Sequence, residues 1–193
     1  MLFARRRAMY DSPEVHTTRE VMELTIDLER QTMRLYTRLS AVFDRDPKLK
    51  EFWFAMARDE ALHVGALDLV STVLELEGKL DSPSPISIDN ATVRRLTTLL
   101  ERHCNDAIPS MSIADALRIA VDIEESEVED MVGDLLKATQ ATGEYERYLR
   151  LLVHDLGDLS YMIEQYCHDP ELLVRCDRLV NRHAEALRLS ALH

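Results

Sequence analysis

The sequence is poor in the residues that interrupt helices. Its 193 residues include only 5 glycines and 6 prolines. Both types break helices, because glycine is too flexible and proline lacks the backbone amide donor. Leucine, alanine, glutamate and arginine, which favour helices, are abundant instead. The composition therefore predicts long helices rather than a sheet protein, and the length suits a single domain over residues 1–193.

Cysteine is scarce as well. The three cysteines, Cys104, Cys167 and Cys176, are odd in number and form no CxxC pair. This count and spacing exclude a disulfide framework, and they also exclude a zinc-ribbon or rubredoxin-type iron site. We therefore expect a reducing compartment, and the cytoplasm is the simplest prediction of location.

Two further absences exclude classes of partner. No run of about 18 uncharged apolar residues occurs. The basic start, Arg5 to Arg7, lacks the apolar stretch of a signal peptide, so we expect no membrane partner. The chain has 23 Lys and Arg against 35 Asp and Glu, a formal net charge of -12. Nucleic acid is not expected as a partner, because phosphate binding needs a basic surface. An acidic chain instead attracts cations.

Capping and turn signals divide the chain into five long helices. A capping box at residues 17–20, an Asp-Pro start at 46–47 and a glycine stop at Gly78 are examples. The expected helices cover about 17–43, 48–77, 112–142, 144–168 and 171–189. The connection over 79–111 holds a turn-rich linker and a short helix.

The order of these helices predicts an all-α fold. Two short loops and one long middle connection give two helical hairpins joined by a crossover, which is the ferritin-like variant of the four-helix bundle. The core bundle would cover about 19–168 and the crossover about 79–111. A C-terminal helix at about 170–189 carries a wide apolar stripe. It must pack on the bundle or on another subunit, so we expect a homo-oligomer.

The two hairpins share a pattern of acidic residues. The nine residues that end in Glu29 parallel the nine that end in Glu124, an offset of 124 − 29 = 95. The second helix contains the one place where Glu precedes His by three residues. The same offset relates two further pairs: Glu60 with Asp155, and His63 with Asp158.

Each of these acids lies in the middle of an apolar helical stripe, where residues three, four and seven positions away are mainly apolar. A buried carboxylate without a partner is costly, and several in one core repel each other. No Lys or Arg occupies these stripes to neutralise them. Two bound divalent cations would do so, and a Glu–His pair at i, i+3 places both side chains on the same side of one helix. The pattern therefore predicts a metal site.

The residues Glu29, Glu60-x-x-His63 and Glu124 resemble the ligand pattern of the rubrerythrin and ferritin-like di-iron superfamily. In that pattern helices one and three each give a Glu, and helices two and four each give Glu-x-x-His. Glu127 resembles the additional helix-three glutamate of rubrerythrins, which changes ligation with redox state. The resemblance covers roughly residues 19–168. It implies two iron ions and an oxidoreductase that reduces peroxide or O₂, or oxidises Fe²⁺.

The fourth helix departs from the family pattern, since Asp155 replaces the Glu and Asp158 replaces the His. Replacing a histidine by an aspartate gives the site more oxygen ligands, which makes iron or manganese the preferred metal. Asp158 could instead orient His63 by a hydrogen bond, and Glu127 could belong to a solvated face. Tyr36 either donates a hydrogen bond near the site or is an ordinary core tyrosine.

The catalytic residues cannot be assigned from this pattern. Because a rubredoxin-type site is missing, a redox role requires a separate electron donor. Iron storage and a non-catalytic helical scaffold that has lost part of the site are the alternative functions.

Overall fold

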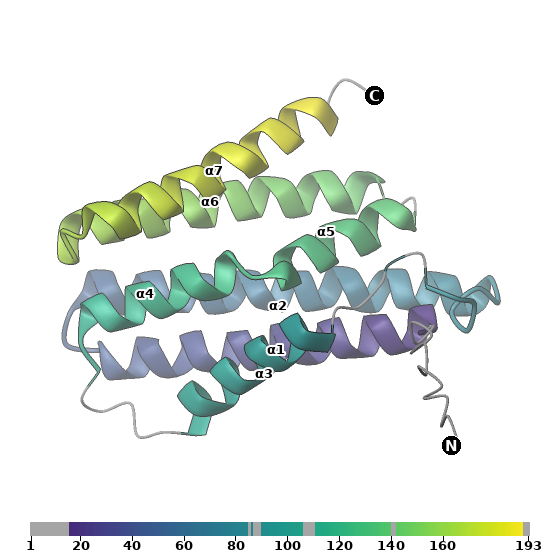
Figure 1. Cartoon of the computed structure of the whole chain (residues 1–193), viewed down its shortest axis with the longest axis horizontal. Helices are drawn as coiled ribbons and strands as arrows, with labels where there is room; N and C mark the ends of the chain where they lie inside the picture. Colours follow the sequence, from purple (N-terminus) through teal and green to yellow (C-terminus); the bar gives the residue numbers. More distant parts are fainter. Residues whose placement is uncertain (1–15, 85, 87–89, 106–110, 140–141, 191–193) are drawn as a thin grey trace, which may run out of the picture.

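The computed structural model describes residues 16–84, 86, 90–105, 111–139 and 142–190, and within them it is all-helical (Figure 1). The helices are α1 (Thr18–Val42), α2 (Pro47–Leu76), α3 (Asn90–Asn105), α4 (Ile113–Glu124), α5 (Glu127–Ala138), α6 (Thr142–Tyr166) and α7 (Pro170–Ser190). The described residues form no strand, only an isolated bridge between Thr17 and Pro83. No described helix is both long and apolar enough to cross a membrane. The prediction of an all-α fold is confirmed.

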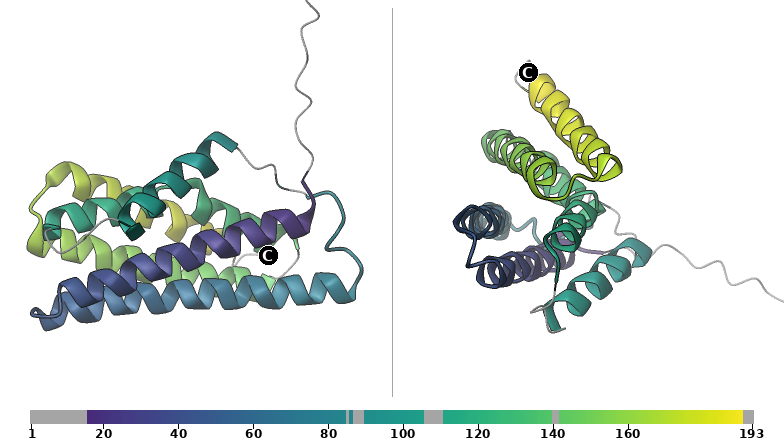
Figure 2. Two further views of the ribbon diagram at one scale, coloured as in Figure 1. Left: turned by 90° about the horizontal axis from the view of Figure 1, so that it is seen from below. Right: turned by 90° about the vertical axis from the view of Figure 1, so that its left-hand side faces the viewer.

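The helices lie along a common direction and form a bundle. Helices α1 and α2 run antiparallel as one hairpin, and α6 and α7 form another (Figure 1). Helices α4 and α5 follow each other end to end, and both pack on α6. Helix α5 also contacts α1 and α2, and α2 contacts α6. Helix α3 lies outside, against α1, as the views in Figure 2 show. The core lies between α1, α2, α4, α5 and α6, and α3 and α7 add buried side chains to it.

The predicted start and stop signals are those that the structure uses. The Thr17 hydroxyl accepts from the Glu20 amide, and the Glu20 carboxylate accepts from the Thr17 amide, which completes the capping box of α1. Gly78, just beyond α2, has a φ of 67°, a left-handed conformation that glycine adopts without strain. These local signals fix the length of the α1–α2 hairpin.

The start of α2 is tied to the end of α6 through Asp46. Its Oδ1 accepts from the amides of Lys48 and Leu49 at 2.9 and 3.3 Å, and its Oδ2 accepts from the Tyr166 hydroxyl at 3.0 Å. We expect Asp46→Ala to lower the free energy of unfolding in urea by about 1–2 kcal/mol, because the helix loses its cap. Asp44→Ala, an exposed position in the same loop, is the control. Equal effects of the two substitutions would contradict this role of Asp46.

The predicted third helix is divided into two. Helix α4 ends at Glu124, and α5 begins at Glu127 after Ser126, whose extended backbone (φ -74°, ψ 158°) is that of an N-cap residue. Serine is common at this position, although the Ser126 hydroxyl makes no capping hydrogen bond, and the three glutamates at 124, 125 and 127 give the segment little apolar surface to hold a continuous helix. The break therefore falls directly after a predicted ligand, Glu124.

The C-terminal helix packs on its own bundle. Leu172, Cys176 and Leu179 of α7 are buried in the core. Arg175 donates to Asp122 at 2.7 Å and to Glu125 at 2.6 Å, both near the end of α4. Helix α7 is thus bonded to the end of α4 at residues close to Glu124 in the sequence.

Candidate metal centre

Three of the predicted ligands meet in the core. Glu29 of α1 and Glu60 and His63 of α2 are 1%, 3% and 4% exposed. The His63 Nδ1 atom lies 3.5 Å from Glu29 Oε2 and 3.3 Å from Glu60 Oε2. One ligand atom from each residue can be chosen so that all three lie within 4.8 Å of one another. This spacing lets a single cation contact all three side chains.

Five of the six side-chain nitrogen and oxygen atoms of this cluster are buried without a well-aligned hydrogen bond. Both oxygens of Glu29, Oε2 of Glu60 and both ring nitrogens of His63 are buried without a hydrogen-bond partner. The two His63 contacts are short, but their alignment is not that of hydrogen bonds. Buried polar groups nearly always have partners, because their desolvation costs several kcal/mol otherwise. Two carboxylates and an imidazole are donors that suit iron, manganese or zinc, so the residues fit a metal ion.

Electrostatics in the metal-free cluster favour bound protons. Burial raises the pKa of Glu60 well above its ordinary value, and the neighbouring Glu29 raises it further. Burial alone lowers the pKa of His63, but the two carboxylates outweigh burial and raise it well above the ordinary value. Without metal, protons therefore take the place of a cation, and a metal ion must displace them on binding.

Glu124 lies in the same core but outside the three-residue cluster. It is buried, and its Oε1 accepts a hydrogen bond of 2.8 Å from the Tyr36 hydroxyl. This contact joins α1 to the end of α4. Tyr36 is therefore a buried tyrosine, and its hydroxyl donates a hydrogen bond to one of the predicted ligands.

We expect Tyr36→Phe to lower the free energy of unfolding by about 1–3 kcal/mol, because Glu124 loses a buried donor. The measurement is urea denaturation of the metal-free protein. Tyr161→Phe serves as the control, since Tyr161 is an exposed tyrosine of α6. If both variants unfold at the same urea concentration as the unsubstituted protein, the hydrogen bond does not hold α4 in place.

The fourth-helix acids do not join the cluster. Asp155 is buried, but it lies beside Asp59, whose charge helps to raise its pKa. Asp158 has a side chain that is 57% exposed, with its Oδ2 3.7 Å from His154 Nδ1. His63 has no hydrogen bond to Asp158. Ligation by Asp155 and Asp158 therefore stays a prediction that would need these side chains to move. The side chain of Glu127, also a predicted ligand, lies outside the described residues.

Sequence reasoning missed Asp59. It is 3% exposed, pairs with Arg58 at 3.1 Å and faces Asp155 across the α2–α6 contact. Burial, followed by the Asp59 charge, raises the pKa of Asp155 to about 8, so this carboxyl pair holds a proton at neutral pH. The 95-residue offset carries Asp59 to His154 (154 − 59), which contacts Asp155 at 3.4 Å.

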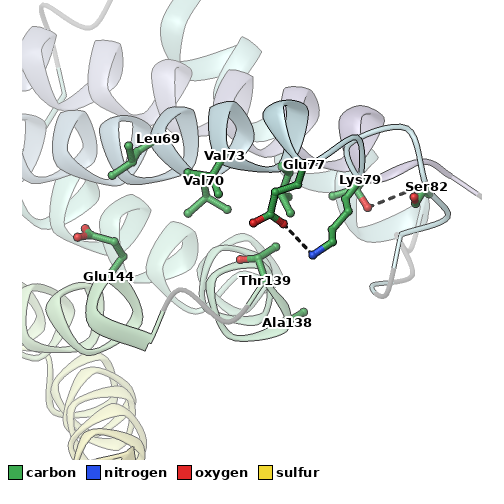
Figure 3. A pocket seen from close by; sticks show the side chains of 11 residues that line it. Leu69, Val70, Val73, Glu77, Lys79, Ser82, Ala138, Thr139 and Glu144 are labelled. Carbon is green, nitrogen blue, oxygen red and sulfur yellow. Dashed lines mark hydrogen bonds and ion pairs between the residues drawn. The ribbon is translucent and has the colours of Figure 1, made fainter.

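Two adjoining grooves run along α2 where it faces α5 and α6. The larger, of about 630 Å³, has Leu69, Val70 and Val73 on one side and Ala138, Thr139 and Glu144 on the other (Figure 3). The smaller, of about 220 Å³, is lined by His63 and by Tyr148, whose ring lies edge-on to the His63 ring with centroids 5.0 Å apart. The smaller groove therefore reaches a member of the cluster.

No protein-family model, curated protein or solved structure matches the chain.

Proposed function

We propose that this protein is a ferritin-like metalloprotein that binds iron in its core, with Glu29, Glu60 and His63 as the primary ligands. The observation that carries the proposal is the set of buried ligand atoms without hydrogen-bond partners. A cation would satisfy them and would replace the proton that burial favours on Glu60.

Glu124 is the predicted ligand that we expect to extend this site toward a second ion, since it is buried and its Oε1 accepts a hydrogen bond from Tyr36. Asp155 would become a further ligand of the second ion if its side chain moved away from Asp59. A bound pair of iron ions would supply redox chemistry with peroxide or O₂, or would catalyse oxidation of further Fe²⁺. Manganese would suit the same donors.

The chain's own residues have separate roles in this proposal. Glu29 and Glu60 bind the cation from two helices, and His63 binds as the neutral imidazole after releasing its proton. Tyr36 orients Glu124. The surrounding apolar side chains, among them Trp53 and Met56, exclude water from the cluster. Electrons for a catalytic cycle would come from a separate donor protein or reductant.

The test is anaerobic loading of the purified protein with Fe²⁺, followed by addition of H₂O₂ or air. We expect bound iron and faster Fe²⁺ oxidation than in buffer, with both lost in Glu60→Ala. Glu23→Ala, an exposed position on α1, is the matched control. No bound metal, together with unchanged stability of Glu60→Ala, would remove the basis of the proposal.

One observation favours a second candidate, a single-metal site without turnover. The exposed Asp158 and the Asp59–Asp155 pair leave only one compact group of three ligands among the described residues. A non-catalytic helical scaffold would then bind one ion per chain. Metal analysis separates the two candidates, since the di-iron site predicts two ions.

Light scattering tests the expected homo-oligomer, and a particle of many subunits would favour iron storage.

A further inference from the structure

The smaller groove connects the surface to the candidate metal centre. It lies between α2 and α6, and its lining includes the exposed Leu62 and Gly65 together with the buried His63 and Tyr148. The exposed residues form its rim and the buried pair forms its floor. A molecule in this groove would thus lie beside the His63 side chain, whose two ring nitrogens are buried and have no hydrogen-bond partner.

The charges at this groove are balanced. Arg147 and Glu144 line it and lie 3.5 Å apart as an ion pair, so their opposite charges largely offset each other at the groove. Behind His63 lie the carboxylates of Glu29 and Glu60, which disfavour an anion. The groove is therefore suited to a neutral molecule.

The size of the groove limits the molecule. A cavity of about 150 Å³ holds benzene, and drug-sized ligands need about 300 Å³ or more. At about 220 Å³ the groove accommodates a small organic molecule. Leu69 and Glu144 line both grooves, so a longer apolar tail could continue along α2 past Val73.

We propose that the α2–α6 groove binds a small neutral organic molecule, with an apolar body against Leu62 and Leu69 and a hydroxyl or hydroperoxide head at His63. Such a molecule would be the substrate class of the metal centre. The reaction of the molecule depends on the proposed function, whereas its binding depends only on the groove.

The test uses 1-hexanol as the probe and saturation-transfer NMR on the full, chelator-treated chain. We expect saturable signals that disappear in Gly65→Leu, which fills the groove. An added Cβ at Gly65 meets nothing within 4 Å, and the same holds at Gly157 of α6, which lines neither groove. Gly157→Leu is therefore the matched control and should retain the signals.

Leu62→Asp provides a second variant at a position that is already half exposed, and it should weaken the signals at least fivefold. Hexanoate should bind more weakly than 1-hexanol because of the carboxylates. Iron binding by Gly65→Leu should be unchanged, so loss of the groove and loss of the metal site are distinguishable.

Four results would overturn the proposal. The first is no signal with the unsubstituted protein, and the second is an undiminished signal in both Gly65→Leu and Leu62→Asp. The third is a dimer that Gly65→Leu converts to monomer, since the groove would then be an interface between copies of the chain. Equal binding of hexanoate would contradict the neutral head group.

Discussion

Replacing Glu60 with glutamine is expected to stabilise the metal-free protein and to abolish its stabilisation by metal. The substitution removes a buried ionisable group that lies against Glu29, so the metal-free protein should gain about 1–2 kcal/mol at pH 8. The same substitution removes an oxygen ligand. Free metal at a hundred times the dissociation constant stabilises an intact site by about 2.7 kcal/mol, and we expect this gain to vanish in Glu60→Gln.

Glu60→Gln should raise the stability of the metal-free protein but remove its stabilisation by metal, and these opposite effects distinguish a metal site from a purely structural cluster. Urea denaturation with and without Mn²⁺ or anaerobic Fe²⁺ measures both effects on one sample. Glu51→Gln, an exposed substitution on the same helix, should change neither quantity. A Glu60→Gln protein that is less stable without metal, and still stabilised by it, would show that Glu60 holds the fold by other means.

The second large effect is a fall in the stability of the metal-free protein as the pH rises from 5 to 8. The pKa values of Glu60, Asp155 and His63 are all raised. In each case the folded state keeps a proton that the unfolded chain has already lost, so stability decreases with pH. For Asp155 the stability is lost over the pH range from about 3.8 to about 8. For His63 the contribution is complete below about 6.5 and is lost as the pH rises through its raised pKa.

The size of this pH effect is several kcal/mol. At 1.36 kcal/mol per pKa unit, Asp155 alone corresponds to a change on the order of 5 kcal/mol across its window. Asp155→Asn should flatten the slope, whereas Asp158→Asn, at an exposed position, should leave it unchanged. Bound metal should reverse the trend, because its ligands must be deprotonated. A metal-free protein that is more stable at pH 8 than at pH 5 would contradict the raised pKa values.

Much of the fold could be predicted from the sequence because its signals are local. The capping box at Thr17, the Asp46 cap and the glycine after α2 act within one turn of their own helices. Apolar periodicity then identifies the buried face of each helix, which is why Glu29 and Glu60 were recognised as core acids before their geometry was known. Two buried acids on adjacent antiparallel helices, one beside a histidine, meet because the hairpin brings them to the same height.

The rest of the site depends on packing that a repeat in the sequence does not encode. The 95-residue offset matches positions along the chain, but each helix is rotated according to its own apolar stripe. In α6 that stripe is Leu152, Leu156 and Leu159, which are all buried. At about 100° per residue, Asp155 lies at its edge and Asp158 lies beyond it.

The break after Glu124 was missed for a related reason. Residues 112–142 keep a helical period throughout, and Ser126 alone does not reveal that its backbone is extended. Asp59 was missed because it lies outside the Glu-x-x-His motif and next to the charged Arg58. Its burial follows from the approach of α6, a contact between residues far apart in the chain.

The central claim is that a metal ion occupies the cluster of Glu29, Glu60 and His63. The most direct test is a crystal of the protein grown with Fe²⁺ under anaerobic conditions, with diffraction data collected on both sides of the iron absorption edge. We predict an anomalous peak within bonding distance of a carboxylate oxygen from each glutamate and of a His63 ring nitrogen. A fully iron-treated crystal without a peak there, in which the three side chains are hydrogen-bonded to one another instead, would contradict the claim.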